Sequence, residues 1–238
     1  MNLILLLYAA IIGLTTLVAV QRSSHNLPVF AFLLITCVTS IGAKLMLVCG
    51  QTTNVGNIFY AGVTFAMSVK FCLYGRDAAM STLRVVFIGL VAITAFRQLA
   101  IWMPVLPGDE TRAAAATYIF KISLPLTTAS FIAFYTAQSV NIYLLGRLRH
   151  WPGWLRKIGA NTVAEAVDSF IFFPIAFGQS WSHQQIAVAM LAGFALKTVL
   201  NILDTPVWLW LCRRQAVANS LEALTSEAMR KSASQRGS

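Results

Sequence analysis

The sequence predicts an all-α, polytopic integral membrane protein, and two properties of the chain lead to this fold class. Of the 238 residues, 58% are hydrophobic and only 11% are charged, and the mean hydropathy is +0.71. A soluble domain carries about 25% charged residues, so this composition is typical of a chain solvated by lipid. The apolar residues also form runs of about 20, the length that a helix needs to cross a bilayer. We therefore expect a helical bundle that uses nearly the whole chain.

The apolar runs predict seven helices. The first run has no basic residue ahead of it and no small-residue cleavage site, so we interpret it as a retained helix rather than a signal peptide. In the long fifth run, Pro125 predicts a break, unless tilt or an extension beyond the bilayer accommodates the length. The expected spans are 2–20, 28–49, 55–75, 83–105, 114–146, 160–178 and 186–212.

Basic residues alternate between the connecting loops, and this alternation predicts the orientation. The loops at 50–54 and 179–185 contain neither Lys nor Arg. The loops on the other side are basic, above all 147–159 with Arg147, Arg149, Arg156 and Lys157. Because Lys and Arg collect in cytoplasmic loops, the C-terminus is expected in the cytoplasm. The chain is then a multi-pass protein of the cell inner (plasma) membrane.

The chain has room for one membrane domain and a tail. We expect a single transmembrane domain over 1–212 and a cytoplasmic tail over 213–238, which is Ala/Ser-rich and charged and predicts a short helix that frays. The net charge of +10 follows the positive-inside pattern, so no nucleic-acid partner is expected. The histidines lie in separate loops and no cysteines form a CxxC pair. We therefore expect no metal and no cofactor, and we interpret the cysteines as small core residues.

Two apolar runs near the C-terminal end carry polar side chains at helical spacing. Offsets of i, i+4 and i+7 place three residues on one stripe of a helix. The two stripes are Asn161, Glu165 and Asp168 in the sixth span, and Lys197, Asn201 and Asp204 in the seventh. A charge facing lipid costs roughly 2.5 kcal/mol or more, so both stripes are expected to face the bundle interior. A short loop joins these spans, which predicts antiparallel neighbours.

The charges of these stripes allow two interpretations. A structural ion pair between Lys197 and either Asp168 or Glu165 would only fix helix packing. Three acids against one lysine leave more carboxylate than a pair needs, and this surplus favours a binding function. An ionised carboxylate accepts paired N–H donors from a guanine-like edge, or it takes up protons during transport. In the fifth span, Gln138 and Asn141 add amides suited to a heterocycle.

From about residue 129 onward, the order of these features resembles the queuosine precursor transporter family, also called vitamin uptake transporters. The residues that carry the resemblance are Gln138, then Asp168, Ser169, Ala176 and Phe177, then Lys197, Thr205 and Pro206. The resemblance implies a six-helix core, similar to the membrane S-components of energy-coupling-factor transporters, with the first span added. It also implies import of 7-deazaguanine precursors, preQ0 or preQ1, or of related nucleobases. The first half departs from the pattern, since Ser68 and Cys72 stand where acids are usual and Asn141 where Asp is common.

The leading hypothesis is therefore a transporter, not an enzyme, that binds a nucleobase-like small molecule in a hydrated hollow between the last two spans. The runner-up is an S-component that needs partner ATPases, since the sequence has no P-loop motif. Two other classes stay open: a structural protein, and an intramembrane enzyme with Asp168 and Asp204 as an aspartyl pair. Homo-oligomers or energising subunits are open partners, beside the lipid bilayer.

Overall fold

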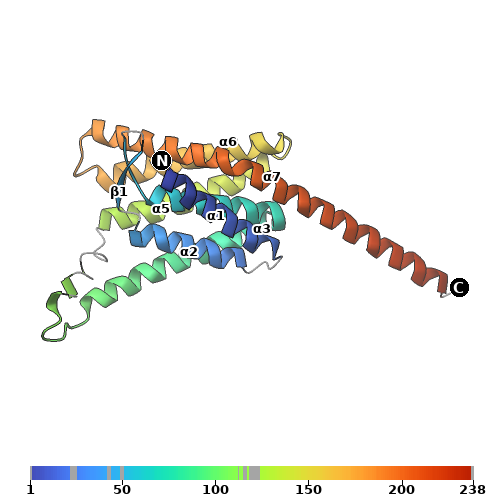
Figure 1. Ribbon diagram of the computed structural model, residues 1–238, viewed down its shortest axis with the longest axis horizontal. Coiled ribbons are helices and arrows are strands. Elements are labelled where there is room, and N and C mark those ends of the chain that lie inside the picture. The colour runs from blue at the N-terminus through green and yellow to red at the C-terminus, as the bar shows by residue number, and fades with distance from the viewer. Residues whose placement is uncertain are drawn as a thin grey trace.

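The computed structural model describes residues 2–21, 26–41, 44–48, 51–111, 113–114, 117 and 124–236. The structure is mainly helical, and the helices pack side by side in one bundle. The C-terminal end of the last helix projects from this bundle (Figure 1). The elements are α1 (Asn2–Val20), α2 (Asn26–Ile41), β1 (Leu45–Val48), β2 (Gln51–Asn54), α3 (Gly56–Trp102), α5 (Leu124–Arg147), α6 (Gly153–Phe177) and α7 (His183–Arg236).

The predicted all-α, polytopic membrane fold is confirmed. In the described part of the chain, α1, α3, α6 and α7 are each long and apolar enough to cross a membrane, and α2 is a shorter apolar helix. Many large hydrophobic side chains, among them Leu3 and Phe170, are exposed on the outside of the bundle, where lipid would cover them. The count of seven spans stays a prediction.

The second expected span is wrong beyond Ile41, because a β-hairpin follows α2. Strands β1 and β2 pair antiparallel, with Leu45 opposite Asn54 and Val48 opposite Gln51. A short apolar run such as Leu45–Val48 is compatible with either a helix or a strand, and periodicity alone does not distinguish them. The hairpin contacts α7 through β2 and leads directly into α3.

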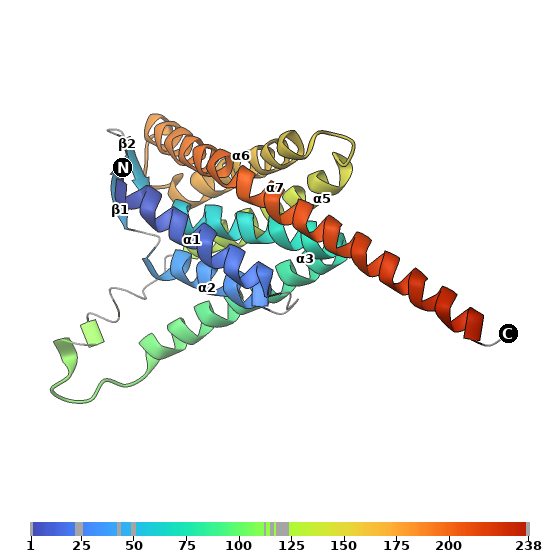
Figure 2. The same cartoon turned by 45° about the vertical axis from the view of Figure 1, so that its right-hand side comes forward.

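Gly75 divides α3 into two helical segments that correspond to the third and fourth expected spans. Its φ of 84° and ψ of −177° lie in a region that only glycine adopts readily. The segments before and after Gly75 turn back on each other, as Figure 2 shows in cyan and green. The sequence analysis separated these two spans correctly, although the helix resumes immediately at Arg76 rather than after a loop.

Replacing Gly75 by alanine is expected to destabilise the protein by about 1–3 kcal/mol, the usual strain of a side chain in this backbone region. Nothing lies within 4 Å of a Cβ built at Gly75, so the effect comes from the backbone alone. The control is Gly13→Ala, at an exposed helical site that is equally open. Unfolding in mixed detergent micelles measures both variants. Equal stability of the two would contradict the assigned backbone conformation.

The core of the bundle forms where α1 and α2 pack against α3. A Cβ at Gly62 of α3 would lie 2.6 Å from Cγ2 of Ile11, so α1 approaches α3 at a distance that only glycine permits. Helix α3 also packs on α5 and α7, and α6 packs on both α5 and α7. The central helices α3, α5, α6 and α7 thereby enclose the polar residues described next.

Three details differ from the sequence analysis. Helix α6 begins at Gly153, seven residues before the predicted span. Helix α7 continues unbroken to Arg236 and projects from the bundle, where a short fraying helix was expected (Figures 1 and 2). A disulfide joins Cys72 of α3 to Cys212 of α7, with the Cα atoms 5.7 Å apart; both pack against the core, as expected of small core residues, but the sequence analysis did not predict that they are bonded.

Candidate functional site

The polar stripes of α6 and α7 face each other, which confirms the predicted antiparallel arrangement. At one level, Nζ of Lys197 lies 2.5 Å from Oδ2 of Asp168. At another, Nδ2 of Asn161 donates to Oδ1 of Asn201 at 3.0 Å. Residues further along α6 thus meet residues earlier in α7, as two antiparallel helices require. The two stripes form a continuous ladder of contacts through the bundle.

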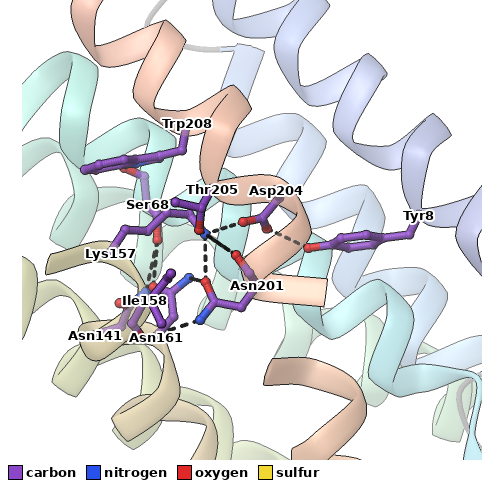
Figure 3. Close-up of polar contacts among 10 residues, drawn as sticks. All are labelled: Tyr8, Ser68, Asn141, Lys157, Ile158, Asn161, Asn201, Asp204, Thr205 and Trp208. Atoms are coloured by element: carbon purple, nitrogen blue, oxygen red, sulfur yellow. Dashed lines mark hydrogen bonds and ion pairs between the residues drawn. The ribbon is translucent and has the colours of Figure 1, made fainter. Parts of the chain in front are cut away.

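Lys157 belongs to this ladder, and its assignment to a basic cytoplasmic loop is wrong. It lies in the first part of α6 and is fully buried. Its ammonium forms an ion pair with Asp204 and donates to Oδ1 of Asn201 at 2.7 Å and to the Asn201 carbonyl at 3.1 Å (Figure 3). Lys157 stands four residues before Asn161 and therefore lies on the same face of the helix as the predicted stripe. The signal was missed because the predicted helix began at residue 160.

Helix α1 contributes one side chain to the same cluster. The hydroxyl of Tyr8 donates to Oδ2 of Asp204 at 2.6 Å, and Tyr8 is 1% exposed (Figure 3). Asp204 therefore has Lys157 on one oxygen and Tyr8 on the other. A carboxylate whose two oxygens are both occupied in this way is fixed in place and has little capacity left for a ligand.

Helices α3 and α5 extend the network across the bundle. Ser68 of α3 donates from Oγ to Oδ1 of Asn161 at 3.1 Å, and Nδ2 of Asn141 donates to the same Ser68 oxygen at 3.4 Å. The indole of Trp208 donates to the Ser68 carbonyl at 2.9 Å (Figure 3). Ser68, the position where the family resemblance expected an acid, thus lies inside the polar cluster.

The second predicted amide of α5 lies in the same interior. Nε2 of Gln138 donates to Oγ1 of Thr64 at 2.8 Å, and Gln138 is fully buried. Several buried polar atoms nearby have no hydrogen-bond partner among the described residues. They include Oε1 of Gln138, Oδ1 of Asn141 and Oγ of Ser169. Buried polar groups are normally satisfied, so these atoms mark a place where water or a ligand would bind.

The Lys197–Asp168 pair lies against an aromatic surface. Nζ of Lys197 stands 4.6 Å from the centre of the Tyr60 ring, a cation–π contact. The Tyr60 ring meets Phe134 edge to face, with the centroids 6.3 Å apart. This end of the cluster therefore combines a charge pair with a flat ring surface, two features that a planar heterocycle would use.

Glu165 is the least satisfied acid of the cluster. It is 2% exposed, and among the described residues it accepts a long hydrogen bond from Oγ1 of Thr198 at 3.4 Å. Among the described residues, the ion pairs of the cluster are Lys157 with Asp204 and Lys197 with Asp168. The sequence analysis counted one lysine against three acids, and this count is wrong because Lys157 is a second lysine. Within the part of the chain that the structure describes, the carboxyl of Glu165 forms no direct ion pair with either lysine.

The cluster is closed, which differs from the predicted hydrated hollow. The eight predicted residues are each 6% exposed or less, and their polar groups touch one another directly. Charged groups in a low-dielectric interior are stable only when they are paired, so without a ligand the side chains satisfy each other. A ligand could enter only if some of these contacts opened. The Lys197–Asp168 pair lies at the end of the cluster where buried polar atoms lack hydrogen-bond partners, so this pair is the one expected to open.

Taken together, these features define a class of protein. Charged side chains inside a membrane bundle are expensive, and their usual role is in a substrate or ion pathway. A polytopic helical bundle with a charged and amide-rich interior is typical of membrane proteins that contain such a pathway, and transporters are one class of these.

Comparison with known proteins agrees with this class. Residues 54–211, more than half of the chain, match the family described as "Putative vitamin uptake transporter", and the chain belongs to this family. The chain is also 26% identical over 167 residues to a protein of Bacillus subtilis (strain 168) named "Probable queuosine precursor transporter". That match covers 66% of this chain and 70% of the relative. No solved structure matches.

Proposed function

We propose that the chain imports a small purine-like queuosine precursor, a 7-deazaguanine such as preQ0 or preQ1, across the cell inner membrane. The name of the Bacillus subtilis relative supports the substrate class, and membership of the uptake family supports the direction. The observation that carries the proposal is the buried ladder between α6 and α7, which holds acids, amides and lysines in the interior of the helical bundle.

In this proposal, the residues of the ladder have different roles. The carboxylates of Asp168 and Glu165 accept the paired N–H donors of a guanine-like edge, because an ionised acid offers only acceptors. Asn161 and Asn201, with Gln138 and Asn141 of α5, match the mixed donors and acceptors of the ring. Lys197 holds Asp168 until the substrate arrives, whereas Lys157, Asp204 and Tyr8 keep the helices in register.

The closed cluster fits a carrier between turnovers. A transporter that exposes its site alternately to each side passes through a state that is open to neither. When the substrate enters, its polar edge replaces the contacts that the side chains make with each other. The Lys197–Asp168 pair opens in this step, and the free acceptor atoms of Gln138 and Asn141 gain partners.

Orientation and partners remain part of the proposal. The basic residues at the end of the membrane region, Arg213 and Arg214, support a cytoplasmic C-terminus. In this proposal the membrane domain covers 1–212 and the tail 213–238 is cytoplasmic, with α7 continuing away from the bundle as far as Arg236. Homo-oligomers and energising subunits remain predictions.

Uptake of labelled preQ0 or preQ1 tests the proposal in cells that lack their own importer. Expression of the chain is expected to raise uptake above that of cells with an empty vector, and excess unlabelled compound is expected to compete. Uptake that never exceeds the vector control, with the protein present in the membrane, would contradict the proposed function.

A further inference from the structure

A covalent bond joins α3 and α7 at one end of the bundle. Cys72 and Cys212 are 140 positions apart in the chain, and their Cα atoms lie 5.7 Å apart, a separation that suits a disulfide. Both side chains are partly exposed, and they pack at the edge of a buried cluster that includes Trp208 and Leu211. The bond therefore fixes these parts of α3 and α7 to each other, and reagents in solution can reach its position.

The bond lies on the side of the membrane that the proposed orientation assigns to the cytoplasm. Cys212 directly precedes Arg213 and Arg214, and Cys72 stands four positions before Arg76. Basic residues at the ends of membrane spans collect on the cytoplasmic side. The cytoplasm keeps most thiols reduced, and the disulfides that form there are usually transient and redox-sensing. This position therefore favours a reversible bond over a permanent structural one.

The same end of α3 and α7 belongs to the polar network. Ser68 stands about one helical turn before Cys72, and Trp208 about one turn before Cys212. The indole of Trp208 donates to the Ser68 carbonyl at 2.9 Å, so α3 and α7 are in contact here (Figure 3). In the proposed function, release of the substrate into the cytoplasm requires the helices that enclose the cluster to separate at this end. A covalent bond between two of these helices opposes that separation.

We propose that Cys72 and Cys212 form a redox switch of transport. The disulfide holds the cytoplasmic end of the bundle closed, and the two free thiols allow it to open. This inference rests on the proposed function and adds its regulation.

The oxidant of the switch is a small disulfide of the glutathione class. The thiolate of one cysteine attacks a sulfur of this compound, which forms a mixed disulfide and releases one small thiol. The thiolate of the other cysteine then attacks the protein sulfur of the mixed disulfide and releases the second small thiol. The two cysteines lose two electrons and two protons, and the two small thiols gain them. An excess of small thiol runs the same steps in reverse.

Uptake of labelled preQ0 or preQ1 by right-side-out membrane vesicles that contain the full chain tests this inference. Vesicles loaded with glutathione disulfide are expected to take up no more than vesicles without the protein, and loading with dithiothreitol is expected to restore uptake. The double variant Cys72→Ser with Cys212→Ser is expected to keep its uptake under both conditions. Cys37→Ser, which removes the free cysteine of the described residues, is the matched control and should respond as wild type does.

Hydrogen exchange of the purified protein gives a second readout that needs no substrate. The backbone amides of 64–72 and 204–212 are expected to exchange more slowly in the disulfide form, because the bond opposes local opening of these two segments. Equal exchange in the two forms, or equal uptake by oxidised and reduced wild type, overturns the inference and leaves the proposed function standing. Wild-type protein that takes up neither compound in either state contradicts the proposed function, and the switch of transport fails with it.

Discussion

Replacing Lys157 by methionine is expected to destabilise the protein by about 3–5 kcal/mol, the usual effect of removing one partner from a buried ion pair. Lys157 is fully buried and supplies the ion pair with Asp204 and two hydrogen bonds to Asn201. Methionine has a similar volume and no charge. The variant would therefore retain the packing and leave the Asp204 carboxylate with Tyr8 alone.

A double variant distinguishes the loss of a partner from the loss of packing. In Lys157→Met with Asp204→Leu, both members of the ion pair are replaced by apolar residues, so neither is left as a charge without its partner and stability is expected to return toward that of wild type. Lys44→Met is the control at an exposed lysine. Reversible unfolding in mixed detergent micelles measures all three. If Lys157→Met matched the control within about 0.5 kcal/mol, the spread of ordinary surface substitutions, the assigned position of Lys157 would be wrong.

The second large effect is expected on transport, when the Lys197–Asp168 ion pair, which would open as the substrate enters, is removed. Replacing Asp168 by asparagine and Lys197 by glutamine together is expected to lower uptake about tenfold to a hundredfold. The asparagine cannot accept two N–H donors as the carboxylate does, and one lost hydrogen bond to a charged group corresponds to about 1.5–3 kcal/mol. Because both members of the ion pair lose their charge at once, neither is left as a buried charge without its partner, and the variant is expected to fold.

The control for this double variant removes the same two charges from the surface. Asp77→Asn with Lys44→Gln changes two exposed residues and is expected to leave uptake unchanged. Uptake is normalised to the amount of protein in the membrane fraction. Wild-type uptake by the Asp168 and Lys197 double variant would show that this pair only joins α6 to α7 and takes no part in substrate binding.

The sequence predicted the parts of the site that helical periodicity can reveal. The offsets of Asn161, Glu165 and Asp168 defined one face of a helix, and the short loop at 179–185 placed the second stripe opposite the first. The contacts of Asp168 with Lys197 and of Asn161 with Asn201 follow from these two facts. The composition and the apolar runs are also local properties of the chain, and they therefore predicted the membrane fold from the sequence alone.

The parts that the sequence did not reveal depend on contacts between distant segments. Tyr8 and Asp204 are separated by 196 positions, and no local pattern identifies the apolar first helix as the source of a hydrogen bond to Asp204. Ser68 and Thr64 are small hydroxyl residues that any membrane helix carries, and only packing brings them to Asn161 and Gln138. The charge count failed because Lys157 follows other basic residues, so the loop pattern concealed its place on the helix face.

A substrate-bound structure tests the central claim most directly, since it locates the ligand. With preQ1 present, we expect density for a bicyclic molecule between α6 and α7, in contact with Glu165 and Asp168, and a separation of Lys197 from Asp168 well beyond the present 2.5 Å. Density for the ligand elsewhere in the bundle, with both ion pairs intact, would contradict the account.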